Sequence, residues 1–211
     1  MLDSSRWYIR LGNLGFNLVV LNLLWISFSF LGLFVLGIFP ATAALFAVLR
    51  PLIMEDEDQP LVKLFFNKFK SEFIMSNLMG YLFLSIGLII YIDFRVLQLL
   101  DNNILQLTLA SITFVIGLVY LLILLFIFPI FVHFDLKFWQ YPKHALILAI
   151  ARPFQTLYMI VGLAIVLFLY VNFTVLILVF GMSLIAFVMM KVASLSLPRK
   201  DSVPSISNEL D

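Results

Sequence analysis

The stretch GIFPATAALFAVLRPLIMEDEDQP, residues 37–60, decides how this chain is organised. It follows a long apolar run and ends in a block of acidic residues. Its apolar part, residues 40–54, either crosses a membrane or lies on the membrane surface. As a helix this part extends about 22 Å, which is short for a hydrocarbon core of about 30 Å. A crossing here would require local thinning of the bilayer or a snorkelling Arg50 side chain.

The composition is that of an integral membrane protein. Of the 211 residues, 64% are hydrophobic and 12% are charged, and the mean hydropathy is +1.13. Soluble domains contain about 45–50% apolar and about 25% charged residues. The net charge of +1 gives no reason to expect nucleic acid as a partner. Since the chain has no cysteine, disulfides and thiol chemistry are excluded.

Uncharged apolar runs predict an all-α fold, a polytopic membrane bundle in a single domain, residues 1–197. The last run is too long for one helix and is divided at Asn172. Beyond it, residues 198–211 are polar with two prolines, which predicts a disordered cytoplasmic tail. The six predicted transmembrane helices are 14–39, 40–54, 73–92, 104–131, 156–171 and 173–192.

The distribution of basic residues favours six crossings over five. Cytoplasmic loops of membrane proteins collect Lys and Arg. With six crossings and both termini in the cytoplasm, 12 of the 13 basic residues lie inside and only Arg95 lies outside. If 40–54 is interfacial, five crossings remain, Arg6 and Arg10 move outside, and the division is 10 to 3.

Two cytoplasmic segments, 61–72 and 142–151, predict short elbow helices next to a crossing. In the first, Phe65 and Phe69 belong to an apolar arc of about 140°, with lysines on the opposite side. This pattern is typical of a helix in the headgroup layer, with the lysines turned toward water. A docking surface for a partner protein is the alternative. The second elbow is apolar on nearly every side.

The sequence indicates no catalytic, cofactor or metal site. His133 and Asp135 could share a metal, but two ligands alone make a poor site. Neither a Gly-rich phosphate loop nor a G-x-S-x-G elbow is present. Ion-coupled transporters usually carry ionisable groups within their membrane helices, whereas here these groups lie at or beyond the helix ends. We therefore expect a protein that is not an enzyme and needs no cofactor.

Neutral polar and small residues within the crossings are interpreted as packing positions. Asn13 and Asn17 share a face of the first helix, while Asn22 points roughly the other way. Such residues form interhelical hydrogen bonds worth about 0.6 kcal/mol on average. Ser76, Gly80 and Gly87 form a small-residue stripe on the third crossing, which would let a neighbouring helix approach closely. The other candidate structural or interaction positions are Pro40, Thr42 and Pro129.

Three ordered blocks carry a resemblance that covers residues 7–191. They are NLVVLNLLWISFSFLGLFVLGIFPATAALFAVLR (17–50), FFNKFKSEF (65–73) and FPIFVHFDLKFWQYPKHALILAIARPFQTL (128–157). In this order they resemble the YesL family of small bacterial multipass proteins. Residues 40–44 resemble the Gly-Pro-Ala-Thr-Ala-Ala turn that opens the family's second helix, with Phe39 in place of the glycine.

The resemblance implies a context rather than a mechanism. It implies a multipass protein of the bacterial cell membrane, encoded beside sugar ABC importers and glycan-degrading enzymes. No catalytic residues are established for the family, so none are transferred to this chain.

Two functions are expected from these observations. The first is an accessory or assembly partner that packs against the permease subunits of a carbohydrate ABC import system. The alternative is a small transporter or channel for a neutral solute, acting as an oligomer. Few polar groups are available to line a solute path, and this favours the accessory role.

Overall fold

The computed structural model describes residues 4–54, 60–100 and 103–195, and within these ranges the chain is helical with no strand. The predicted tail, 198–211, lies outside the described residues. The helices in the described part are α1 (Ser4–Leu31), α2 (Ile38–Met54), α3 (Leu61–Ser71), α4 (Phe73–Leu97), α5 (Asn103–His133), α6 (Gln140–Ala151), α7 (Pro153–Asn172), α8 (Val175–Val179) and α9 (Gly181–Ser194).

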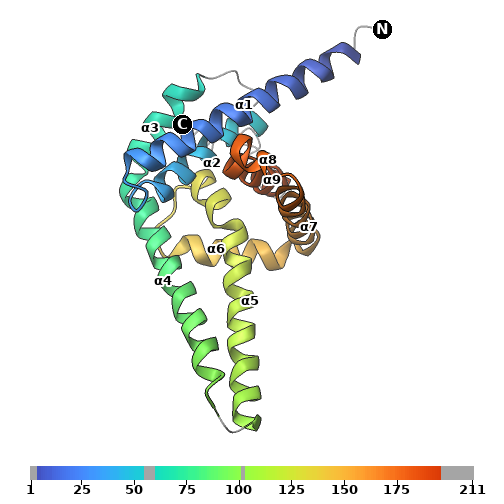
Figure 1. Cartoon of the computed structure of the whole chain (residues 1–211). Helices are drawn as coiled ribbons and strands as arrows, with labels where there is room; N and C mark the ends of the chain where they lie inside the picture. Colours follow the sequence, from blue (N-terminus) through green and yellow to red (C-terminus); the bar gives the residue numbers. More distant parts are fainter. Residues whose placement is uncertain (1–3, 55–59, 101–102, 196–211) are drawn as a thin grey trace, which may run out of the picture.

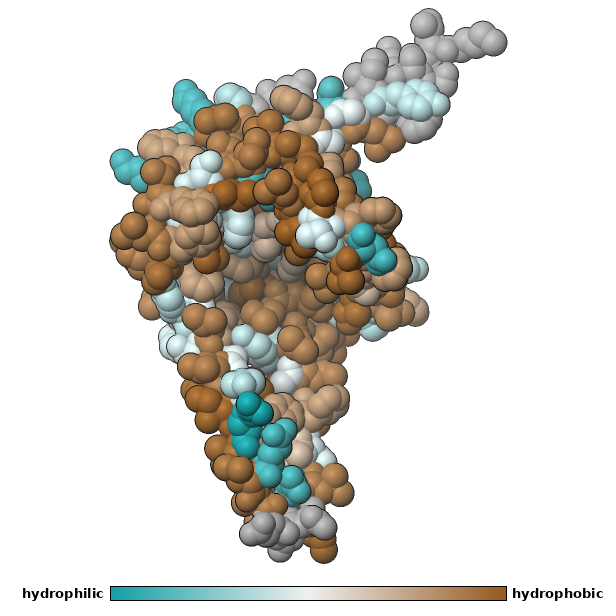
Figure 2. All heavy atoms as spheres, viewed as in Figure 1, coloured by the Kyte–Doolittle hydropathy of each residue, from teal (hydrophilic) through white to brown (hydrophobic). Residues whose placement is uncertain are grey.

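The helices have the length and composition of membrane segments. In the described part of the chain, four stretches are long and apolar enough to cross a membrane: Leu11–Leu31, Phe73–Leu97, Ile104–His133 and Pro153–Asn172. The apolar helices α2 and α9 are shorter. Hydrophobic side chains cover most of the face shown in Figure 2, and a hydrophilic patch lies on the α4–α5 hairpin. The all-α membrane class is therefore confirmed, while six crossings remain a prediction.

Helix α2 forms the centre of the fold. Ten consecutive residues, from Pro40 to Leu49, are buried, so every side of the helix is covered over almost three turns. The neighbours are α1, α3, α4, α5 and α9. Alanines at positions 41, 43, 44 and 47 allow these neighbours to approach closely. Residues 40–49 are thus enclosed by protein, whereas a helix lying on a membrane surface would leave one face uncovered.

The first helix ends earlier than the apolar pattern predicts. Helix α1 stops at Leu31 instead of residue 39, and a turn over residues 32–37 leads into α2. Leu33 and Phe34 have φ angles of 55° and 60° in this turn, a left-handed conformation that side chains disfavour. Helix α4 holds the turn: Asn77 Nδ2 donates to the Leu36 carbonyl at 3.0 Å, and the Tyr81 hydroxyl donates to the Val35 carbonyl.

These contacts place the α1–α2 turn close to the beginning of α4. Asn77 and Tyr81 follow Phe73 by four and eight residues, or about 6–12 Å along the helix axis. In Figure 1, α4 and α5 form a long hairpin that extends away from the other helices, and α1 runs across the opposite end of that hairpin. The turn therefore lies far from the hairpin tip.

Both elbow helices form. Helix α3 begins at residue 61 as expected, and part of its apolar face packs on α1, while Val62 and Phe66 remain 58% and 52% exposed. Phe65 is fully buried, and the ring centroid of Phe28 in α1 lies 5.2 Å from that of Phe65 and 5.0 Å from that of Phe69. Helix α6 begins at residue 140, two residues before the predicted start, and packs along α5.

The last predicted crossing, 173–192, is not one continuous helix. It divides into α8 and α9 at Phe180–Gly181, where Gly181 has a φ of +26°. The apolar sequence around residue 181 does not predict this break, because the side chains that hold it belong to α1 and α7. Elsewhere the structure extends the predicted ranges by a few residues, to Leu97 in α4, His133 in α5 and Pro153 in α7.

Candidate functional site

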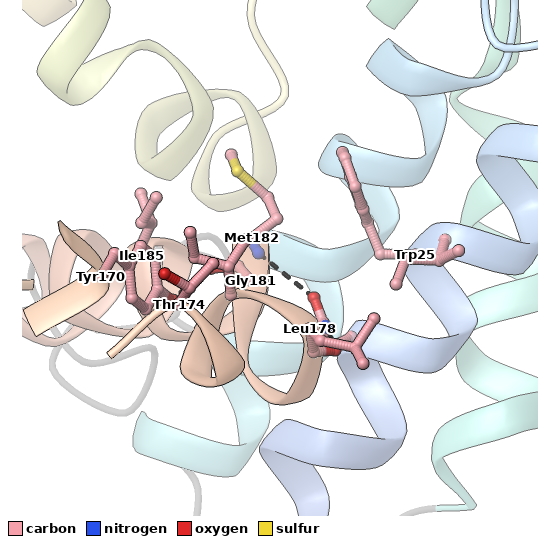
Figure 3. A pocket seen from close by; sticks show the side chains of 10 residues that line it. Trp25, Tyr170, Thr174, Leu178, Gly181, Met182 and Ile185 are labelled. Atoms are coloured by element: carbon pink, nitrogen blue, oxygen red, sulfur yellow. Dashed lines mark hydrogen bonds between the residues drawn. The ribbon is translucent and has the colours of Figure 1, made fainter. Parts of the chain in front are cut away.

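The break between α8 and α9 is held by one side chain of α1. Asn22 is only 1% exposed, and its Nδ2 donates to the Leu178 carbonyl at 3.0 Å. The Met182 N–H donates to Asn22 Oδ1 at 3.2 Å, as the dashed line in Figure 3 shows. Helix ends leave backbone donors and acceptors without intrahelical partners. The Asn22 amide thus supplies a partner on each side of the break, and we call this arrangement the Asn22 clasp.

Gly181 fits the clasp because it has no side chain. A Cβ at this position would lie 2.7 Å from Asn22 Oδ1, and the positive φ is itself unfavourable for other residues. The Gly181 carbonyl accepts a hydrogen bond from the Tyr170 hydroxyl at 2.6 Å. Helix α7 therefore fixes the other side of the same break.

A pocket of about 600 Å³ opens beside the clasp, between α1, α7, α8 and α9 (Figure 3). Its lining is almost wholly apolar. The apolar side chains that line it include Trp25, Ile26, Ile177, Leu178, Met182 and Ile185. Pockets of this size are typical of small-molecule sites, which are mostly apolar with a few polar groups.

Apart from the exposed hydroxyl of Thr174, the polar side chains that line the pocket are hydrogen-bonded within the protein. Trp25 Nε1 donates to the Thr42 hydroxyl at 3.0 Å, and that hydroxyl donates to the Ile38 carbonyl at 2.7 Å. The Asn22 amide and the Tyr170 hydroxyl are occupied by the backbone of α8 and α9. The arrangement therefore offers shape and apolar contact rather than recognition of a polar solute.

The structure assigns the contacts at the break to Asn22, and not to Asn13 and Asn17, which the sequence predicts as packing positions. Asn13 is exposed and Asn17 is half-buried, and neither lines the pocket. Asn22 points away from the other two asparagines, and this is the direction in which α9 lies. The sequence does contain a signal for this contact. Asn22 is a single amide on a long apolar face of α1, and the region Asn172–Gly181 lies opposite it.

The other predicted positions lie within the helix packing. Thr42 alone is connected to the pocket, through Trp25. Gly80 receives the ring of Phe39 from α2, while a Cβ on Gly87 would lie 2.6 Å from the Tyr120 hydroxyl of α5. The predicted stripe thus serves two neighbouring helices. Pro40, Ser76 and Pro129 are buried in α2, α4 and α5, and Phe65 and Phe69 belong to α3.

Clusters of metal-binding side chains do not occur in the described ranges, where no three His, Asp or Glu residues come together. In the α4–α5 hairpin, the Thr113 hydroxyl donates to Asp93 Oδ2. Arg95 lies 5.8 Å from the ring centroid of Tyr91. The pocket beside the Asn22 clasp is therefore the strongest candidate for a functional site.

Comparison with known proteins identifies relatives over most of the chain. A model of the family "Protein of unknown function, DUF624" matches residues 18–94, which include Asn22 and all of α2. Two relatives of Bacillus subtilis (strain 168) are the uncharacterized proteins YteU and YesL. YteU is 38% identical over 91% of this chain and 82% of its own, and YesL is 34% identical over 84% and 83%.

A third protein of the same organism, the uncharacterized protein YesV, is 34% identical over 81% of both chains. No solved structure matches this chain significantly. The length and identity of these alignments agree with the resemblance carried by the three sequence blocks. The chain belongs to the YesL-like family of membrane proteins.

Proposed function

We propose that this protein is a non-enzymatic membrane protein that acts as an accessory or assembly partner of a carbohydrate ABC import system. The observation that carries the proposal is the apolar lining of the pocket, where every polar side chain except Thr174 is already hydrogen-bonded within the protein. A path for a neutral polar solute needs hydrogen-bonding walls. Association between membrane helices relies instead on close packing.

The sugar-import context is supported by the resemblance to the YesL family. Placement in the bacterial cell membrane, with both termini in the cytoplasm, belongs to the same proposal. The 12-to-1 division of basic residues supports that orientation.

Copurification from native membranes in mild detergent tests the accessory role. We expect a permease subunit to be retained with the tagged protein. Deletion of the gene should slow growth on one complex carbohydrate and leave growth on glucose unchanged. Recovery of the protein without any permease subunit, together with normal growth on every carbohydrate tested, would contradict the proposal.

A small transporter for a neutral solute is the second candidate function. The discontinuous α8–α9 segment beside a pocket favours it, because transporters often build their binding sites at broken membrane helices. Purified protein in liposomes distinguishes the two functions. Movement of a neutral solute without a partner protein would support the transporter, whereas tight liposomes would support the accessory role.

A further inference from the structure

We propose that the pocket beside the Asn22 clasp binds one alkyl chain of a membrane phospholipid. The proposal is independent of the accessory role, since a lipid could occupy the pocket whatever the protein's partner is. It follows from the size of the pocket, the chemistry of its lining, its surroundings and a single hydroxyl at its edge.

The size of the pocket suits a ligand larger than a single ring. An apolar cavity of about 150 Å³ is enough to remain dry and bind benzene. The volume here, about 600 Å³, is four times larger. A helix with its side chains is about 10–12 Å wide, so one turn already takes about 420–610 Å³. The pocket can therefore enclose a flexible chain, but hardly more than one turn of a partner helix.

The side chains that line the pocket favour an apolar ligand. Ile26 of α1, Ile177 of α8 and Ile185 of α9 contribute aliphatic side chains, and Trp25 contributes an aromatic wall. Because the indole N–H is bonded to Thr42, the ring presents apolar surface to the pocket.

The lipid around the protein can supply such an alkyl chain directly. Helix α8 leaves Val175 and Leu178 more than two-thirds exposed, and Leu178 also lines the pocket. In a membrane protein such side chains contact lipid tails. A chain from the adjacent leaflet can therefore enter along α8 without passing through water.

One hydroxyl is placed to hold the polar end of a lipid. Thr174 lines the pocket at the start of α8 (Figure 3), and its hydroxyl forms no hydrogen bond with the residues that the structure describes. An ester carbonyl of a phospholipid can accept a hydrogen bond from it. The pocket thus combines an apolar interior with a single polar group at its edge.

Fluorescence of Trp25 tests the proposal in the full-length protein. Trp7→Phe and Trp139→Phe leave Trp25 as the only tryptophan of the chain. The protein is titrated, in mild detergent, with a phospholipid that carries a dibrominated acyl chain. We expect quenching to saturate near one lipid per protein. Quenching that increases in proportion to the lipid content of the micelle would overturn the proposal.

Two variants with matched exposure locate the effect. Ile177 and Ile160 are both 46% exposed, but only Ile177 lines the pocket. Ile177→Phe should fill the pocket and weaken saturable quenching at least about tenfold, because extra bulk at a packed site is unfavourable. Ile160→Phe should leave it unchanged, and equal effects of the two variants would count against the site.

A third variant distinguishes a loss of lipid binding from a folding defect. Ile177→Ala enlarges the pocket, so saturable quenching should persist while circular dichroism and elution volume stay unchanged. A photo-crosslinker at residue 177 in native membranes should capture phospholipid. Capture of a polypeptide alone would overturn the proposal and identify the pocket as a docking point for a partner protein.

Discussion

At the residue scale, the side-chain amide of Asn22 supports two backbone groups that the α8–α9 break removes from helical hydrogen bonding. Its Nδ2 donates to the Leu178 carbonyl and its Oδ1 accepts from the Met182 N–H. Within a bilayer no water is available to replace such partners, and an unsatisfied backbone group costs several kcal/mol. The break is therefore stable only while α1 and α9 stay together.

Removal of this amide should destabilise the fold. Asn22→Leu keeps a similar volume but leaves the Leu178 carbonyl and the Met182 N–H without their partner. We expect a loss of about 2–6 kcal/mol in the free energy of unfolding, about 1–3 kcal/mol for each of the two groups, measured by detergent-induced unfolding. Asn17→Leu is the control: this half-buried residue lies outside the clasp and should change stability by less than about 0.5 kcal/mol. Equal losses for the two variants would show that the clasp is dispensable.

Gly181 should tolerate no side chain. In Gly181→Ala the new Cβ would lie 2.7 Å from Asn22 Oδ1, at a φ of +26°. Strain of this kind costs about 1–3 kcal/mol. Gly117→Ala is the matched control, since its Cβ would meet only Ile90 at an ordinary 3.8 Å. Combined with Asn22→Ala, the Gly181→Ala change should be less harmful than alone, because the clashing oxygen is absent. Additive losses in unfolding free energy would contradict the clasp.

At the element scale, helix α3 shows what hydrophobic periodicity can and cannot establish. The apolar arc and the opposing lysines predict the helix and its orientation. They do not distinguish protein from lipid as the cover of the arc, because both are apolar. The decisive contact, between Phe28 and Phe65, joins segments that only the fold brings together. The turn at 32–37 and the break at Phe180–Gly181 escaped prediction for the same reason: both lie in continuous apolar sequence and depend on groups from other helices.

Two neighbouring phenylalanines of α3 provide a test. Phe65 is fully buried, whereas Phe66 is 52% exposed. Phe65→Ala should lower the free energy of unfolding by about 3–5 kcal/mol, since it leaves a cavity against α1 and α2. Phe66→Ala should lower it by less than half of that amount. Detergent-induced unfolding of both variants measures the difference, and a similar loss for both would place α3 at the lipid surface after all.

At the scale of the whole molecule, the structure limits what the distribution of basic residues can establish about membrane topology. The 12-to-1 division disfavours an arrangement in which 40–54 alone fails to cross. It does not distinguish six crossings from an arrangement in which α1 and α2 both enter the membrane and return. In either case the N-terminus and residues 55–72 lie on the cytoplasmic side. Composition and periodicity thus establish the membrane class and most helices, but not how deep each helix reaches.

The depth of the α1–α2 turn separates the two arrangements. Asn77 and Tyr81 hold the turn about 6–12 Å from the first residue of α4, and a further run of about 24–30 Å along α4 leads to the hairpin loop. If α4 crosses the membrane, the turn and the loop cannot both reach the outer surface.

Since the chain contains no cysteine, single cysteines can be placed at Leu33, which is 82% exposed, and at Asn102. With a membrane-impermeant thiol reagent on intact cells, we expect labelling of Asn102→Cys and protection of Leu33→Cys. Both should react once the membranes are solubilised, which confirms that each thiol is accessible. Labelling of both cysteines on intact cells would establish six crossings and show that α1 and α2 span the bilayer.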